Sequence, residues 1–191
     1  NINIQDFSNV GGALSSFVMP VQNGLTYLKN KITCNNTFFS DMASLKEGDK
    51  APYFEGINQD GKKITLDDFK GKKLILYFYP KDNTSGCTAE ACSLNDSYSS
   101  LTEKGFEVVG VSPDSANSHL KFIAKYNLAF NLIADTEKKI LEAYGVWAEK
   151  KLYGRTYMGV VRTTFIINAN GIIERIITKV NTKDHAKQIL E

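Results

Sequence analysis

The sequence predicts an α/β fold in which helices flank a mixed central sheet. Residues 74–79 and 106–112 are largely apolar and rich in aromatic and β-branched side chains, which is typical of strands buried on both faces. Helix-like sequence follows each of these stretches, and a hairpin pattern followed by a helix closes the chain. This order favours a layered sheet with strands in both directions.

Shorter β-prone stretches bounded by turn residues are expected to form the other strands. The pair Asp60-Gly61 and the run at 168–171 (Asn-Ala-Asn-Gly) favour the tight turns of two antiparallel hairpins. The first of these would give the domain an N-terminal hairpin ahead of the buried strand at 74–79. In chain order, the shorter strands are 53–57, 63–66, 130–134, 163–167 and 172–178.

Helices are expected in the intervals between these strands and after the last one. Asp135 is a typical cap for the third helix, and Thr182 is expected to open the last. The mixed-charge stretch at 149–151 is expected to lie in a solvated loop. The expected helices cover about 88–103, 114–126, 135–144 and 182–190.

The chain is expected to divide near residue 41, into an N-terminal extension over 1–41 and a domain over 42–191. The extension has few charges, many Asn, Ser and Gly residues, and no strand-turn rhythm. Apolar residues at helical spacing over 21–32 fit one amphipathic helix that docks on the domain or on a second subunit. A tag, a leader or a loosely ordered arm fits equally well, and Cys34 there is expected to be a bystander thiol.

Composition and charge limit the classes of function. The chain has 191 residues, of which 42% are hydrophobic and 23% charged, as in ordinary globular domains. The net charge of +2 does not favour nucleic acid or an anionic membrane as a partner. Three cysteines do not make a disulfide framework, and no apolar stretch near the start resembles a membrane span or signal peptide, so a cytoplasmic protein is expected.

The candidate catalytic residues follow the buried strand at 74–79, because functional sites in α/β proteins lie beyond the carboxyl ends of the strands. There the sequence reads Pro80-Lys-Asp-Asn-Thr84-Ser-Gly-Cys87. Cys87 stands where the loop becomes a helix, and the free N–H groups of a helix start favour the nucleophilic thiolate. Thr84 can place a hydroxyl beside the sulfur. The plain alternative, a small buried core residue, is weakened by a second cysteine nearby.

Cys92 follows Cys87 by five residues. On an intact helix their Cα atoms would lie about 8–9 Å apart, whereas a disulfide needs less than about 7 Å. A disulfide between them therefore requires the first helical turns to unwind. The alternative for Cys92 is a core thiol on the inner face of the helix.

The pattern Pro80, Thr84 and Cys87 resembles the active-site motif Pro-x-x-x-Thr-x-x-Cys of the peroxiredoxins. It is most similar to the bacterioferritin comigratory protein (PrxQ) branch, whose second cysteine also follows five residues later. The similarity covers about residues 45–190, with further motifs at 48–52 and 157–165.

Two features depart from that branch. Ser85 stands where the branch usually has proline, which makes the loop less stiff but removes no catalytic atom. The extension over 1–41 has no counterpart in the family. Members of the branch are often monomeric, so a monomer is expected, with a dimer through this extension as the alternative.

The resemblance implies a thioredoxin fold and a thiol peroxidase mechanism that needs no metal, haem or flavin. Cys87 would be the peroxidatic residue that attacks a hydroperoxide and becomes a sulfenic acid, and Cys92 would resolve it as an intramolecular disulfide. A thioredoxin-type protein would then reduce the disulfide. Thr84 would orient the peroxide, and Arg162, from a distant strand, would stabilise the thiolate, while Pro80 shields the site.

Five other side chains have plainer expected roles. Glu90 either polarises the site or is a solvated carboxylate at the helix start. His119 is expected to be a satisfied, partly buried histidine, and His185 a surface residue. Trp147 and Tyr153 are expected to anchor the core or a loop rather than to line the pocket.

Two other functions are consistent with the same cysteines. A copper-binding thioredoxin-fold chaperone pairs two cysteines with a distant histidine, although it usually spaces them one residue closer and is tethered to a membrane. A redox sensor or holdase uses oxidation to change a binding surface. Metal titration would test the first, and catalytic turnover with a reductant would test the second.

Overall fold

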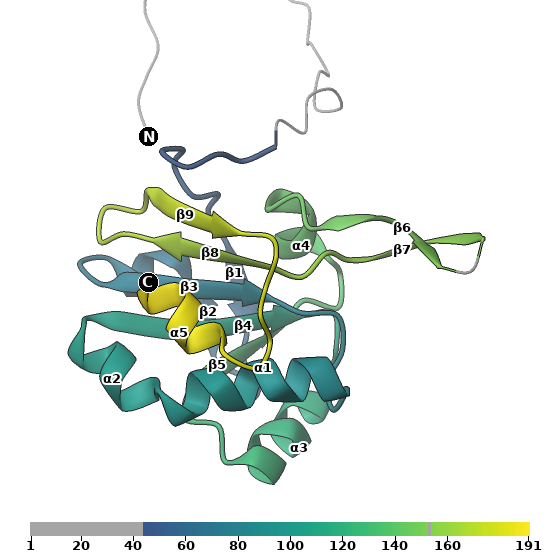
Figure 1. Cartoon of the computed structure of the whole chain (residues 1–191), viewed down its shortest axis with the longest axis horizontal. Helices are drawn as coiled ribbons and strands as arrows, with labels where there is room; N and C mark the ends of the chain where they lie inside the picture. The colour runs from purple at the N-terminus through teal and green to yellow at the C-terminus, as the bar shows by residue number, and fades with distance from the viewer. Residues whose placement is uncertain (1–43, 153) are drawn as a thin grey trace, which may run out of the picture. The chain divides into compact units, whose positions relative to one another are not determined.

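The computed structural model describes residues 44–152 and 154–191 (Figure 1). The expected extension over 1–41, with its helix over 21–32 and Cys34, lies outside the described residues, as does Tyr153.

The central sheet has five strands in the order β5-β4-β3-β8-β9. The middle strand β3 (Lys73–Phe78) pairs in parallel with β4 (Phe106–Ser112), which pairs in parallel with β5 (Asn131–Ala134). On its other side β3 pairs antiparallel with β8 (Thr163–Ile167), which pairs antiparallel with β9 (Ile173–Ile177). The predicted mixed sheet is confirmed.

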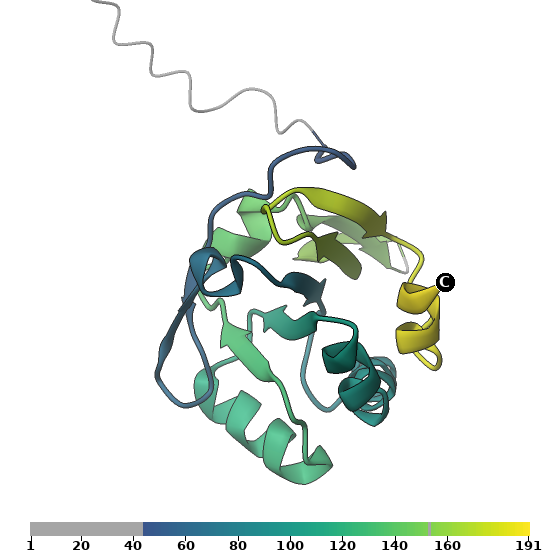
Figure 2. The ribbon, with the colours of Figure 1, turned by 90° about the vertical axis from the view of Figure 1, so that its left-hand side faces the viewer.

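Side chains of β3 alternate between two apolar clusters, one on each face of the sheet. Leu74, Leu76 and Phe78 face the cluster that contains α4 (Lys139–Ala143). Ile75 and Tyr77 face the cluster on the other side, which includes side chains from four helices. Figure 2 shows the sheet nearly edge-on between these groups of elements.

The helices of the second cluster connect or follow the strands. They are α1 (Ser85–Asp96), α2 (Tyr98–Glu103), α3 (Ala116–Tyr126) and α5 (His185–Leu190). The predicted helix over 88–103 thus begins earlier and is divided at Ser97, whose φ of −103° and ψ of 8° leave the helical region. Asn, Asp and Ser compete with helical hydrogen bonding through their own side chains, and this chain places all three in a row at 95–97.

The predicted N-terminal hairpin is also confirmed, with β1 (Glu55–Ile57) antiparallel to β2 (Lys63–Thr65). It is followed by a short 3-10 helix, η1 (Leu66–Phe69). The turn between β1 and β2 lies against the edge strand β5, where the Gln59 side-chain oxygen accepts a hydrogen bond of 3.0 Å from the Leu132 N–H.

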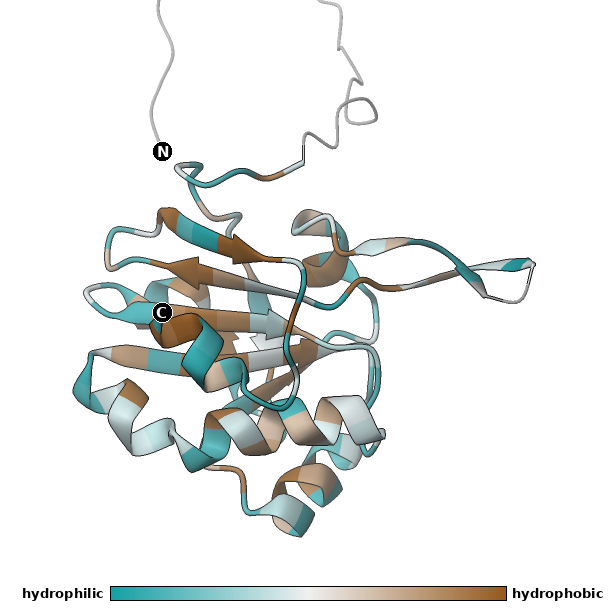
Figure 3. Ribbon diagram, viewed as in Figure 1, coloured by the Kyte–Doolittle hydropathy of each residue, from teal (hydrophilic) through white to brown (hydrophobic). Residues whose placement is uncertain are grey.

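An additional hairpin, β6 (Trp147–Leu152) with β7 (Arg155–Val160), was not predicted. The expectation of a solvated loop at 149–151 is therefore wrong, since these residues are paired in β6. The hairpin extends away from the sheet (Figure 1), and its outer end is hydrophilic, unlike the apolar central strands (Figure 3). A strand exposed on both faces has no apolar alternation, so the usual sequence signal is missing.

Trp147 begins β6 and has the anchoring role expected of it. Its ring packs against the first apolar cluster, and the Lys138 ammonium lies 5.7 Å from the ring centroid. The tryptophan therefore fixes the base of the hairpin to the core.

Gly110 in β4 provides the space that the Tyr77 ring occupies. A Cβ atom at this position would lie 2.7 Å from the Tyr77 hydroxyl and 2.6 Å from a methyl of Leu132. The absent side chain lets Tyr77 stack on Tyr79, with ring centroids 5.3 Å apart, beneath the helix that follows β3.

We therefore expect Gly110→Ala to lower the free energy of unfolding by about 1–3 kcal/mol, because the methyl group overpacks a filled core. Urea denaturation followed by circular dichroism measures this. An unchanged midpoint would mean that Tyr77 and Leu132 can move aside freely, contrary to the packing described.

Candidate active site

The loop between β3 and α1 brings Cys87 into the first turn of the helix. Pro80 lies two residues after the end of β3, and Asn83 adopts a left-handed conformation with φ of 57°. Thr84 is the N-cap residue, and its carbonyl accepts the first helical hydrogen bond from the Thr88 N–H at 2.9 Å. Cys87 is buried, with 1% of its surface exposed, on the apolar cluster beneath α1.

Asp82 fixes the loop to the rest of the domain. Its carboxylate accepts hydrogen bonds from the Ser118 hydroxyl at 2.6 Å and the Tyr79 hydroxyl at 2.7 Å, and it lies 2.9 Å from Nδ1 of His119. Burial raises the pKa of Asp82, but the hydrogen bonds from His119, Ser118 and Tyr79 outweigh it and hold the pKa below its usual value. His119 is satisfied as predicted, and it is more deeply buried than expected.

Arg162 reaches Cys87 from the other half of the chain. Its Nη2 donates to the Cys87 sulfur at 3.1 Å. Arg162 lies in the connection between β7 and β8 rather than in a strand, which corrects the expected placement. The sheet register explains the meeting, because Thr163 pairs with Phe78 at the end of β3 from which the Cys87 loop departs.

Glu90 is the second partner of Arg162. Nη1 of Arg162 donates to Oε2 of Glu90, one helical turn beyond Cys87. The Glu90 side chain is fully buried, so the alternative of a solvated carboxylate is wrong. Burial raises the pKa of Glu90 to about 7, although the charge and hydrogen bond of Arg162 act to lower it.

His185, expected at the surface, is fully buried. Its Nε2 lies 2.8 Å from the Thr164 hydroxyl and 3.8 Å from Oε1 of Glu90. Burial lowers the pKa of His185 to about 4. The expectation failed because α5 is short and carries little periodicity, while its packing on α1, with a 3.3 Å hydrogen bond from the Ala186 N–H to the Ser93 hydroxyl, is a tertiary contact.

Thr84 and Pro80 lie in the loop that precedes Cys87, and neither side chain is hydrogen-bonded to the Cys87 sulfur in the structure. The Thr84 hydroxyl donates to the carbonyl of Lys81 at 3.1 Å, within the loop, and its side chain is exposed. Pro80 is half-buried just after the end of β3. Their expected roles toward the peroxide therefore remain predictions.

Cys92 lies further along the same unbroken helix and is half-buried. Both Cys87 and Cys92 are free thiols. Because α1 is helical over both residues, their Cα atoms are separated by the distance of about 8–9 Å expected for an intact helix. Burial, and to a smaller extent the charge of Asp96, raises the pKa of Cys92 above its usual value.

Comparison with known proteins agrees with this geometry. The model of the AhpC/TSA family matches residues 47–176, well over half of the chain. The chain belongs to this family. Peroxiredoxin Bcp of Bacillus subtilis is 45% identical over 148 residues, covering 78% of this chain and 94% of that protein. Peroxiredoxin Bcp of Escherichia coli K12 is 40% identical over 149 residues, covering 78% and 96%.

Solved structures place the chain in the same group of peroxiredoxins. Peroxiredoxin Q of Xanthomonas campestris superposes with a TM-score of 0.68 at 35% identity, covering 72% of this chain and 87% of that one. Peroxidoxin BcpB of Mycobacterium tuberculosis gives 0.68 at 30% identity, covering 76% and 94%. The central sheet with its flanking helices is thus the thioredoxin fold of the peroxiredoxins.

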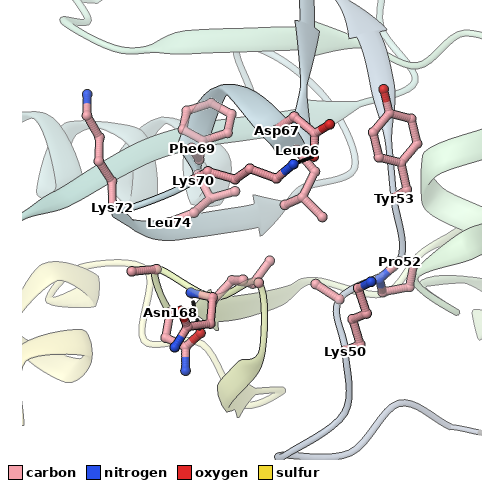
Figure 4. Close-up of a pocket in the computed structure, with 15 residues that line it drawn as sticks. Lys50, Pro52, Tyr53, Leu66, Asp67, Phe69, Lys70, Lys72, Leu74 and Asn168 are labelled. Atoms are coloured by element: carbon pink, nitrogen blue, oxygen red, sulfur yellow. Dashed lines mark hydrogen bonds and ion pairs between the residues drawn. The ribbon is translucent and has the colours of Figure 1, made fainter.

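A cavity of about 770 Å³ in this peroxiredoxin lies away from Cys87 (Figure 4). It is lined by Leu74 at the start of β3, Leu66, Phe69 and the turn around Asn168. Since Cys87 follows the end of β3, the cavity lies at the opposite end of that strand. The candidate site is instead identified by its hydrogen bonds.

No group of three or more His, Cys, Asp and Glu side chains in the part of the chain that the structure describes is placed to hold a metal ion. Within the same residues, no helix combines the length and apolar character that crossing a membrane requires.

We expect Arg162→Lys to slow the alkylation of Cys87 by iodoacetamide at neutral pH by about tenfold. Lysine keeps the charge but cannot hold the sulfur and Glu90 together, as the planar guanidinium does. Rates are measured by mass spectrometry. Arg155→Lys, in the exposed hairpin, is the matched control and should leave the rate unchanged; equal rates in the two variants would contradict the geometry.

Glu90 also predicts a pH dependence of stability. Its folded pKa of about 7 lies above the ordinary value of 4.5, so the folded state binds the proton more tightly. Its stabilising contribution is complete below about pH 4.5 and is lost as the pH rises through about 7. When the pH is raised from about 5 to about 8, the free energy of unfolding of Glu90→Gln should therefore fall by roughly 2 kcal/mol less than that of the original chain.

Urea denaturation at the two pH values tests this difference. Glu174→Gln, a partly exposed glutamate of β9, serves as the control and should follow the original chain. If Glu90→Gln and the original chain lose stability in parallel, the carboxyl does not bind a proton in this range.

Proposed function

We propose that this peroxiredoxin, a thiol peroxidase, reduces hydroperoxides through Cys87, with Arg162 as the cation that stabilises the reacting thiolate. The observation that carries the proposal is the 3.1 Å contact between the Arg162 guanidinium and the Cys87 sulfur at the first turn of α1. A cation and a helix start both favour a negative charge on the sulfur, and the thiolate is the nucleophilic form.

In the proposed reaction, the Cys87 thiolate attacks the terminal oxygen of the hydroperoxide. The O–O bond breaks, Cys87 becomes a sulfenic acid, and water or an alcohol leaves after taking up a proton. Arg162 stabilises the charge that develops on oxygen. Thr84 and the Cys87 N–H orient the peroxide, while Pro80 limits the access of water.

Cys92 is proposed to resolve the sulfenic acid. Its thiolate displaces water from the Cys87 sulfur and forms an intramolecular disulfide, which requires the first turns of α1 to unwind because the intact helix holds the two cysteines too far apart. Reduction by a thioredoxin-type dithiol through thiol–disulfide exchange returns both thiols.

The test is mass spectrometry of the reduced protein after addition of one equivalent of hydrogen peroxide. We expect the chain to lose two hydrogens, with the disulfide mapped to Cys87 and Cys92. Cys87→Ser should abolish the reaction, and Cys92→Ser should leave a sulfenic acid on Cys87.

Other outcomes separate the rival functions. Rapid oxidation without turnover by thioredoxin and its reductase would favour a redox sensor or holdase. Unreactive thiols together with stoichiometric binding of copper would overturn the peroxidase mechanism in favour of a metal chaperone.

A further inference from the structure

One oxygen of the buried Glu90 carboxyl has no hydrogen-bond partner. Oε2 accepts from Arg162, whereas Oε1 is buried with no partner in the structure. A buried carboxylate oxygen without a donor is destabilising, because its lost hydration is not replaced by a hydrogen bond. The neighbouring group that could change this is His185, whose Nε2 lies 3.8 Å from Oε1.

The hydrogen bonds of Gln188 determine which nitrogen of His185 carries the proton. The Gln188 amide nitrogen donates to the Lys179 carbonyl at 2.8 Å, and its oxygen accepts from the Asn181 N–H at 2.9 Å. That oxygen is 3.2 Å from Nδ1 of His185, so Nδ1 must be the donor. The neutral ring therefore presents the bare lone pair of Nε2 to the Thr164 hydroxyl and towards Glu90.

Around Glu90 and His185, the groups that can carry a negative charge outnumber the cations in contact with them. Arg162 is the cation in contact with both Glu90 and Cys87. Arg175 of β9 is bound to the carbonyls of Gln188 and Ile189 at the end of α5, and the Tyr77 hydroxyl of β3 stays neutral because burial raises its pKa well above the usual value. One guanidinium therefore faces two groups that can each become an anion, the Cys87 thiol and the Glu90 carboxyl.

We propose that Glu90 and His185 together hold the proton that Cys87 releases, so that Arg162 is free to stabilise the thiolate. The proton leaves the sulfur and is taken up by the Glu90 carboxylate, where it is shared between Oε1 and Nε2 of His185. The net charge of the cluster is unchanged, and no oxidation or reduction occurs. His185 is a positioning residue, since it acts through Glu90 and Arg162. This inference rests on the proposed role of Cys87.

Two consequences follow from the geometry. With the proton on the Glu90–His185 pair, the partnerless oxygen gains its hydrogen bond once the Thr164 hydroxyl, 2.8 Å from Nε2, rotates away from that lone pair and the two groups approach. Without it, Glu90 is an anion that competes with the thiolate for Arg162. The burial that raises the pKa of Glu90 to about 7 and lowers that of His185 to about 4 is consistent with a proton residing on the carboxyl side of the pair.

The test compares two substitutions that should act in opposite directions. Glu90→Gln is permanently neutral and should lower the pH at which half of Cys87 is thiolate, by about one unit. His185→Gln can donate to Oε1 but cannot accept a proton, so it holds Glu90 as an anion and should raise that pH by a similar amount.

The measurement is the pH dependence of Cys87 alkylation by iodoacetamide, made on the full chain with Cys34 and Cys92 replaced by serine. The double variant Glu90→Gln with His185→Gln should behave as Glu90→Gln alone, because His185 acts through the carboxyl. Lys187→Gln changes an exposed side chain of the same helix, α5, and should leave the midpoint in place.

A purely structural role for His185 would shift both single variants in the same direction or neither, and either result would overturn the proposal. If His185→Gln fails to fold, Glu90→Gln and Thr164→Val still test it, since loss of the Thr164 hydroxyl leaves Nε2 to Glu90 alone and should lower the midpoint. Hydrogen peroxide consumption by the original chain and by Cys87→Ser is measured separately, so failure of the peroxidase proposal is seen there and not in the titration.

Discussion

The guanidinium of Arg162 joins parts of the chain that otherwise have no reason to meet at one point. It contacts a cysteine and a glutamate on successive turns of α1 while it is itself attached to the start of β8. This contact depends on the antiparallel pairing of β8 with β3. The pairing places Thr163, the first residue of β8 and the neighbour of Arg162, beside Phe78, the last residue of β3, after which the cysteine loop begins. The chemistry of the site therefore depends on the register of the central sheet.

The sequence was sufficient to predict the elements whose signals are local. The strands β3 and β4 are apolar runs, and the start of α1 follows turn residues and a characteristic motif, so Cys87 and Thr84 could be singled out. Arg162 was identified only through the resemblance to the peroxiredoxins, which includes the stretch at 157–165. The burial of Glu90 and His185 could not be predicted, because each polar side chain is buried only through contact between α1, α5 and β8. The β6–β7 hairpin was missed for the opposite reason, since it has too little burial to leave a pattern.

Helix α1 has to satisfy two requirements that conflict. Its intact first turns hold the Cys87 sulfur against Arg162 and bury Glu90 beneath the helix. The same turns keep Cys92 away from Cys87, so a disulfide requires that arrangement to be given up temporarily. The interruption of the helical run at Ser97 limits how far such an unwinding has to extend, because α2 is a separate helix packed on β4.

The contact between Gln59 and β5 has a consequence for how copies of this protein behave in a crowded solution. An outermost strand with free backbone groups is a template on which another chain can add a strand. Here a side-chain amide oxygen occupies the Leu132 N–H, and Asn58 forms a bridge with Ile133, so this border offers an incomplete row of donors and acceptors to a neighbour. The turn of the first hairpin thereby protects the sheet against edge-to-edge aggregation.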